Sequence, residues 1–192
     1  MSLLHYVSHP EVVIDAAIPV PDWSLNERGR ERARSLLRQP WLASVGRVIS
    51  SPEAKAIETA DVIAGHLGLP VQIRRTTGEV DRSATGYMPA ARHEELADLL
   101  FAEPTRSAAG WERAIDAQRR LLDALADVVA DGPSDVAVVG HGGVGTLLLC
   151  HLAGLEVDRR YDQPGLGSHW CFDRTTGNVV HRWRRIDVPG DR

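Results

Sequence analysis

Residues 135–153 read DVAVVGHGGVGTLLLCHLA, an apolar strand that runs directly into a glycine-rich helix. A short apolar run bounded by glycine, followed by a longer apolar segment, is typical of a buried strand and its crossover helix in an α/β protein. His141 stands where this strand ends. Ligands of open α/β sheets bind at the carboxyl ends of the strands, so His141 lies where we expect a site.

The rest of the chain repeats this alternation of short apolar runs and amphipathic segments. We expect strands at residues 3–7, 46–50 and 69–73, and a closing hairpin of strands at 168–172 and 179–186. We expect helices at residues 24–38, 51–67, 93–101, 110–130 and 142–153. This pattern predicts a three-layer α/β/α sandwich with a mostly parallel central sheet, as a single domain over residues 1–192.

Local signals predict where three of these helices begin or end. Ser24 and Glu27 fit a capping box, in which each side chain satisfies a free backbone N–H at the start of a helix. Ser51-Pro52 fits a second helix start, because serine caps and proline suits the first helical position. Residues 131–133, Asp-Gly-Pro, are expected to close the long helix that begins near residue 110.

Composition places the chain among ordinary globular proteins. Its 192 residues are 43% hydrophobic and 25% charged, and 22 basic against 26 acidic residues leave a net charge of −4, which argues against a nucleic-acid partner. No apolar run approaches the roughly 18 residues of a membrane helix, and the first residues lack the pattern of a secretory signal. We therefore expect a cytoplasmic protein without a membrane partner, in which Cys150 and Cys171 are buried free thiols.

Chemically useful side chains follow three of the expected strands. His9 follows the first strand, Lys55 opens the helix after the second, and His141 follows the strand at 135–139. Lys55 is the only lysine in a chain with 21 arginines. Because parallel strands end at one edge of the sheet, the two histidines and the lysine are expected to converge there.

The order and spacing of these stretches resemble the signatures of the histidine phosphatase superfamily, whose fold is phosphoglycerate mutase-like. Where that family's first strand ends in Arg-His-Gly, this chain has Ser8-His9-Pro10. The family's second signature is Ser-Ser-Pro, then an arginine, then Thr-Ala, and residues 50–60 here read SSPEAKAIETA. Its third is a strand followed by His-Gly-Gly, matched here from His141, and Glu79 occupies the place of the family's acidic residue in the central loop.

The resemblance implies hydrolysis of a small phosphorylated metabolite without a metal or another cofactor. His9 would attack phosphorus and carry the phosphoryl group, helped by Lys55, whose charge lowers the pKa of His9. His141, protonated or donating a hydrogen bond, and the Gly142 amide would stabilise the phosphoryl oxygens. Glu79 would protonate the leaving alkoxide and then activate water. We expect the rings of His9 and His141 to stack face to face around a common oxyanion.

Two positions depart from the family pattern, since Ser8 and Lys55 both stand where the family has arginine. Arginine binds two phosphoryl oxygens with a planar fork, whereas lysine is a point charge and serine a neutral donor. The loss of one preorganised donor lowers a rate on the order of 10²–10³-fold. Arg82, in the loop after Glu79, is the candidate replacement cation, against the simpler interpretation of a surface charge.

Three alternatives stay open at this level. The departures at Ser8 and Lys55 favour a catalytically weak or inactive phosphate-ester-binding protein on the same fold. A phosphoglycerate mutase-type phosphotransferase would use the same residues, although the chain is short for one. Residues 140–145, GHGGVG, also match a dinucleotide-binding fingerprint, which is the basis for a remote oxidoreductase alternative. The substrate and the oligomeric state, a homodimer included, are not encoded in any pattern that we can interpret.

Overall fold

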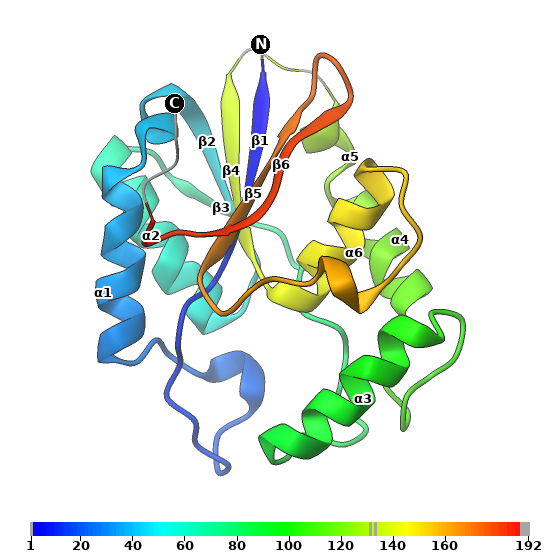
Figure 1. Ribbon diagram of the computed structural model, residues 1–192. Coiled ribbons are helices and arrows are strands. Elements are labelled where there is room, and N and C mark those ends of the chain that lie inside the picture. The colour runs from blue at the N-terminus through cyan, green and yellow to red at the C-terminus, as the bar shows by residue number, and fades with distance from the viewer. Residues whose placement is uncertain (1, 131, 133, 189–192) are drawn as a thin grey trace.

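A six-stranded sheet in the order β3-β2-β4-β1-β5-β6 forms the middle of the molecule in the computed structural model, which describes residues 2–130, 132 and 134–188 (Figure 1). The strands are β1 (Leu3–Ser8), β2 (Val45–Ser50), β3 (Val71–Ile73), β4 (Asp135–Gly140), β5 (Ser168–Asp173) and β6 (Asn178–Arg185). The first four pair in parallel, and β5 pairs antiparallel with both β1 and β6. The mostly parallel sheet is confirmed, and the hairpin of β5 and β6 closes it as expected.

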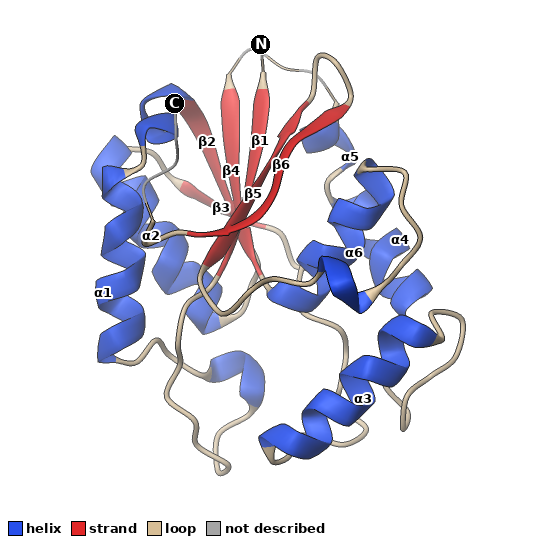
Figure 2. Cartoon of the chain, in the orientation of Figure 1, coloured by secondary structure: helices blue, strands red, loops and turns tan. Residues whose placement is uncertain are grey.

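Helices cover both faces of this sheet (Figure 2). The α-helices are α1 (Glu27–Ser35), α2 (Ala54–Leu67), α3 (Ala90–Ala102), α4 (Ala114–Ala124), α5 (Ala126–Val129) and α6 (Gly142–Leu152). Short 3₁₀ turns are η1 (Val20–Asp22), η2 (Leu36–Arg38), η3 (Pro40–Ser44) and η4 (Arg159–Tyr161). With α1 and α2 on one face and α4 and α6 on the other, the predicted three layers are confirmed. Within the described ranges, no helix has the length and apolar character needed to cross a membrane.

The period-two alternation of the strands divides the core into two apolar clusters. In β1, Leu4 and Tyr6 belong to the cluster under α4 and α6, whereas Val7 belongs to the cluster under α1 and α2. Successive side chains of a strand point to opposite faces, so a strand buried on both faces must be apolar at nearly every position. Cys150 and Cys171 are buried free thiols in this core, as predicted.

Both predicted helix starts are wrong. Helix α1 begins at Glu27 and is capped by Asn26, which accepts a hydrogen bond from the Gly29 amide at 2.8 Å, so Ser24 and Glu27 form no capping box. Asn26 also donates to the Val12 carbonyl, so the start of α1 is held against the loop between β1 and α1. Helix α2 begins at Ala54 rather than at Ser51-Pro52, because the Ser51 amide still continues the strand pairing, with the Val139 carbonyl as its acceptor.

The long helix predicted for residues 110–130 is two helices. The backbone leaves the α conformation at Leu125 (φ −113°, ψ 12°), where α4 ends and α5 begins. Residues 110–113 belong to the preceding loop, where the Trp111 indole donates to the Thr85 hydroxyl at 2.8 Å. The predicted terminator at 131–133 lies partly outside the described residues, since positions 131 and 133 are not among them.

The carboxyl ends of β1, β2 and β4 all point toward one edge of the molecule. Two segments lie beyond that edge: the loop between β1 and α1, which contains η1, and the helix α3 (Figure 1). The residues that follow these three strands therefore meet in one place, as the sequence predicted.

Candidate active site

His9 and His141 lie side by side at the ends of two adjacent parallel strands. Ser8 of β1 pairs in register with Gly140 of β4, and the His9 amide donates to the Gly140 carbonyl at 3.0 Å. The centroids of the two imidazole rings are 5.3 Å apart, with an angle of 70° between the ring planes. The two rings meet as predicted, but edge to face, so the predicted face-to-face stacking is wrong; each ring is oriented by its own hydrogen bonds.

His9 is held as a neutral imidazole with one nitrogen free. Its Nδ1 lies 2.8 Å from the Pro10 carbonyl oxygen, which can only accept, so Nδ1 carries the proton and Nε2 has the lone pair. Burial, with smaller contributions from the neighbouring His141 and Lys55, lowers the pKa of His9 to about 3. The predicted direction of the pKa shift is confirmed, with burial rather than Lys55 as its main cause. This is the protonation state and tautomer of a nitrogen nucleophile.

His141 is fully buried and faces two partners in the turn between β2 and α2. Its Nε2 lies 2.7 Å from the Ser51 hydroxyl and 3.3 Å from Glu53 Oε1. Burial lowers the pKa of His141, while the carboxylates of Glu53 and Glu79 act in the opposite direction. The net shift of the pKa is downward, although Glu53 lies at ion-pair distance, and either predicted form of His141, protonated or neutral, can donate a hydrogen bond from this position.

Glu53 is a site residue that the sequence analysis missed. Its carboxylate forms an ion pair with Lys55, accepts from the Glu79 amide at 2.9 Å and faces His141. Burial raises the pKa of Glu53, but His141 and Lys55 outweigh this effect and hold the pKa at about 2. A carboxylate inside the SSPEAKAIETA stretch, two residues before the lysine, was the signal available in the sequence.

Lys55 reaches the site but is already engaged there. It is 3% exposed, and besides the Glu53 carboxylate its Nζ donates to the Val20 carbonyl at 2.8 Å. The charge of Lys55 still lowers the pKa of His9, so it acts on the expected nucleophile from within the pair. A phosphoryl group would have to share Lys55 with Glu53.

Glu79 occupies the amino end of α6. Its carboxylate accepts from the Gly143 amide at 3.1 Å and from the Val144 amide at 2.9 Å. Burial raises the pKa of Glu79, yet His141, Arg82 and the amides of Val80 and Val144 make the net shift downward. Glu79 is thus an ionised carboxylate against Gly143, at the helix terminus where we expected a phosphoryl group to bind.

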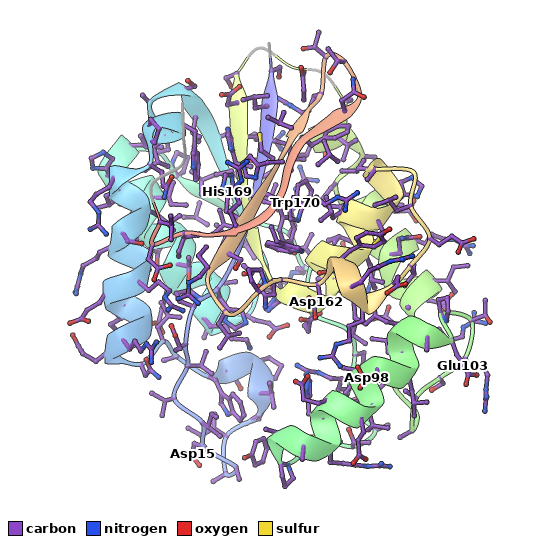
Figure 3. All side chains as sticks on the ribbon, viewed as in Figure 1. Asp15, Asp98, Glu103, Asp162, His169 and Trp170 are labelled. Atoms are coloured by element: carbon purple, nitrogen blue, oxygen red, sulfur yellow. The ribbon has the colours of Figure 1, made fainter. Side chains whose placement is uncertain are left out.

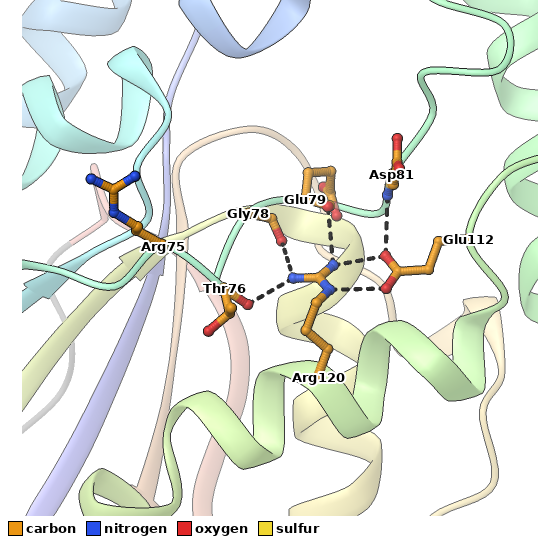
Figure 4. A pocket seen from close by; sticks show the side chains of 7 residues that line it. All are labelled: Arg75, Thr76, Gly78, Glu79, Asp81, Glu112 and Arg120. Carbon is orange, nitrogen blue, oxygen red and sulfur yellow. Dashed lines mark hydrogen bonds and ion pairs between the residues drawn. The ribbon is translucent and has the colours of Figure 1, made fainter.

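Arg120 holds the loop that carries Glu79 (Figure 4). From α4, its guanidinium donates to the carbonyls of Thr76 at 2.8 Å, Gly78 at 3.1 Å and Glu79 at 3.2 Å. It also pairs with the Glu112 carboxylate at 2.8 Å. This clip is a tertiary contact between segments about 40 residues apart, and no local sequence signal predicts it.

Ser8 turns its side chain toward Gln163, a second residue that the sequence analysis missed. The buried Ser8 hydroxyl lies 2.5 Å from Gln163 Oε1 and accepts from the Ser168 amide at 2.9 Å. The other end of the Gln163 amide lies over Gly142, where a Cβ atom would stand 2.1 Å from Nε2. Ser8, Gly142 and Gln163 therefore form one wall of the site.

Arg82 is turned toward α3 and the loop before α4 instead of toward the histidines. Its guanidinium contacts the His93 ring and lies 5.6 Å from the centre of the Trp111 ring. Its charge nevertheless contributes to the lowered pKa values of Glu79 and His141. Arg82 acts on the site at a distance in this conformation, and a role as a direct replacement cation stays a prediction.

Comparison with solved structures finds the same fold in several phosphatases. A mycobacterial glucosyl-3-phosphoglycerate phosphatase bound to inorganic phosphate superposes with a TM-score of 0.76 at 21% identity, covering 98% of this chain and 100% of the other. A putative α-ribazole-5′-phosphate phosphatase of Escherichia coli gives 0.77 at 19% identity and covers 100% of both chains. A phosphoserine phosphatase of Entamoeba histolytica gives 0.75 at 16% identity, covering 98% and 100%. No sequence among curated proteins matches.

The sequence also matches a family model, described as the histidine phosphatase superfamily (branch 1), over residues 15–181. The match begins after the Ser8-His9-Pro10 stretch, so it does not depend on the altered first signature. It agrees with the strand order and with the pair of imidazoles at the ends of β1 and β4. The dinucleotide-binding alternative is thereby overturned, and the chain belongs to branch 1 of the histidine phosphatase superfamily.

Proposed function

We propose that the protein is a metal-independent phosphomonoesterase that hydrolyses a small phosphorylated metabolite through a phosphohistidine at His9. One observation carries the proposal: His9 is buried and neutral, with Nδ1 held by the Pro10 carbonyl and its Nε2 lone pair available beside His141.

The reaction would proceed in two steps. In the first, the Nε2 lone pair of His9 forms the N–P bond, the P–O ester bond breaks, and the leaving alkoxide takes a proton from Glu79. In the second, ionised Glu79 removes a proton from water, the resulting oxygen attacks phosphorus, and the N–P bond returns its electrons to His9. His141 donates a hydrogen bond to the phosphoryl oxygens in both steps.

Glu79 must gain a proton before the first step, because it is ionised in the free protein. A phosphoryl dianion that approaches the amino end of α6 would compete with Glu79 for the Gly143 and Val144 amides. A carboxylate that loses these donors and gains an anionic neighbour has its pKa raised. Substrate binding would thus supply the protonated acid, and proton uptake would accompany binding.

Hydrolysis and intermediate trapping test the proposal. We expect the protein to release inorganic phosphate from p-nitrophenyl phosphate and an acid-labile phosphate to be trapped on His9 after acid quench. His9→Ala should abolish both signals, whereas His151→Ala, at an exposed position on α6, should leave them unchanged. A phosphorylated species that persists in His9→Ala would remove the phosphohistidine mechanism.

A specific observation favours a second candidate, a catalytically weak or inactive phosphate-ester-binding protein. Two expected sets of phosphoryl donors are occupied by carboxylates, Lys55 by Glu53 and the α6 amides by Glu79. If these pairs persist in the complex, the site would bind a phosphate ester weakly and turn it over slowly. Binding of a phosphate ester without release of inorganic phosphate would select this candidate over the first.

A further inference from the structure

The Gln163 side chain joins the ends of the two elements that carry the histidines. On one side its Oε1 lies 2.5 Å from the hydroxyl of Ser8, the residue before His9. On the other side its Nε2 lies over Gly142, the residue after His141, so closely that a Cβ atom there would stand 2.1 Å away. The amide therefore stands at the edge of the sheet where the two imidazoles meet.

The hydrogen bonds of Ser8 determine which way the Gln163 amide faces. The Ser8 hydroxyl accepts from the Ser168 amide at 2.9 Å, and of the two acceptors in reach of its one proton, Gln163 Oε1 at 2.5 Å is much nearer than the Ser168 carbonyl at 3.3 Å. A separation of 2.5 Å suits an O–H···O bond and is too short for a bond from an amide N–H. Oxygen Oε1 therefore faces Ser8, and the NH₂ group faces Gly142.

The backbone of Gln163 is fixed against α6. The Gln163 amide nitrogen donates to Asp162 Oδ1 at 2.7 Å, and the Thr146 hydroxyl lies 3.0 Å from the same oxygen. Thr146 lies on α6, and its hydroxyl is also 2.9 Å from the Gly142 carbonyl. Figure 3 shows Asp162 beside this helix. Main chain and side chain are thus both held, which makes the NH₂ group a preorganised donor.

No described residue accepts a hydrogen bond from Gln163 Nε2, and this atom is open to solvent, so an incoming anion can reach it. Ser8, which precedes the expected nucleophile, has a hydroxyl whose proton is already used to orient Gln163. We propose that Gln163 is an oxyanion-binding residue of the site, an inference that rests on the proposed function. Its NH₂ group would donate to the phosphoryl group, and Ser8 would act as its positioning residue.

Titration with inorganic phosphate, followed by calorimetry, tests this role independently of turnover. Gln163→Ala should weaken phosphate binding about 10-fold to 100-fold, the effect of losing one hydrogen bond to a charged group. Gln163→Glu keeps the size and the acceptor for Ser8 but turns a negative charge toward the anion, so it should bind more weakly still. Gln72→Ala, on the exposed edge strand β3, is the matched control and should bind like the wild type.

Ser8→Ala separates the positioning role from direct contact. It should weaken binding less than Gln163→Ala does, and the double variant should bind like Gln163→Ala alone, because Ser8 acts through Gln163. Thermal unfolding of each variant checks that the fold is retained, and Gln163→Glu serves as the isosteric variant if the alanine variant unfolds.

Each outcome decides the inference. It is overturned if wild-type protein does not bind phosphate, if Gln163→Ala binds within twofold of wild type, or if Gln163→Glu binds as tightly as wild type. The proposed function fails on a different measurement, the dependence of hydrolysis on His9. A protein that binds phosphate through Gln163 without hydrolysing esters would support the inference and refute the enzyme.

Discussion

Replacing Glu53 by glutamine should make the protein less stable and its affinity for phosphate higher. Glu53 forms a buried ion pair with Lys55, whose side chain is almost inaccessible to solvent. Its Oε1 is also 3.3 Å from His141 Nε2, a nitrogen that we expect to donate to the phosphoryl group. In Glu53→Gln both donors lose a competing carboxylate, and Lys55 loses its counter-charge.

The two effects can be estimated from this geometry. A phosphoryl oxygen that accepts from His141 Nε2 would lie roughly 5 Å from Glu53, where a pair of like unit charges repels by roughly 3 kcal/mol at an effective dielectric constant of about 20. Removing that repulsion corresponds to a gain of about 100-fold in phosphate affinity. Leaving Lys55 as a buried charge without its partner lowers the free energy of unfolding by roughly 3 kcal/mol.

Urea unfolding with and without inorganic phosphate, together with calorimetric titration, measures both quantities. Phosphate at about 100 times its Kd stabilises a protein by about 2.7 kcal/mol, so it should restore most of the stability that Glu53→Gln loses. Asp61→Asn removes the same charge from an exposed position of α2 and should change neither quantity. A Glu53→Gln variant that binds phosphate as weakly as wild type, or more weakly, would refute the idea that Glu53 competes for the phosphoryl donors.

Glu79→Gln should lower the rate of hydrolysis of an alkyl phosphate on the order of 10²–10⁴-fold. The loss with p-nitrophenyl phosphate should be smaller, because p-nitrophenolate leaves without a proton, and equal losses in kcat would argue against an acid role for Glu79. Arg120→Met should lower kcat, and it should lower the free energy of unfolding by about 1–3 kcal/mol, because three loop carbonyls lose their donor. An unchanged kcat would mean that Arg120 is not needed to position Glu79. Gly145→Ala should lower the free energy of unfolding by about 1–3 kcal/mol, since the new Cβ would stand 2.4 Å from Tyr6 Cε1. Gly65→Ala, whose Cβ would have no atom within 4 Å, should leave stability unchanged, and equal urea midpoints for the two variants would contradict this reasoning. Burial lowers the pKa of His5 from 6.5 to about 3, so the stability that neutral His5 contributes is complete above pH 6.5 and is lost as the pH falls toward 3. At pH 5 this loss is about 2 kcal/mol, and urea unfolding of His5→Phe should lack that part of the acid destabilisation.

Most of the fold could be predicted because its signals are local. The apolar run at 135–139 and the glycine-rich helix after it produce β4 and α6 almost within their predicted limits. Gly68 ends α2 in the left-handed conformation (φ 67°), as its place after the last apolar residue indicated. The errors fall on the helices, and each depends on the surrounding fold. At α1 it selects Asn26 as the cap, at α2 strand pairing delays the start to Ala54, and at Leu125 a break divides the predicted long helix.

The glycines of residues 140–145 show how a local pattern misleads without tertiary context. A dinucleotide fingerprint accounts for such glycines by the approach of a pyrophosphate. Here they make room for neighbours inside the protein: a Cβ at Gly140 would stand 2.3 Å from the Tyr6 hydroxyl, and one at Gly142 would stand 2.1 Å from Gln163 Nε2. Both neighbours are far away in the sequence, so the pattern alone could not identify them.

The sequence alone determined that His9 and His141 would lie at the same edge, because parallel strands end at one edge of the sheet, and the strand order with β4 beside β1 then made them neighbours. It also determined the layers, since the period of the apolar residues dictates which segments are strands and which are helices. Only the tertiary structure decided that Glu53 pairs with Lys55 and faces His141, that Glu79 lies on the α6 amides, and that Gln163 and Arg120 support the site. Strand ends are positioned by backbone pairing, which a pattern encodes. The partner of a side chain is whichever group the folded chain brings within about 3 Å, and that depends on every segment at once.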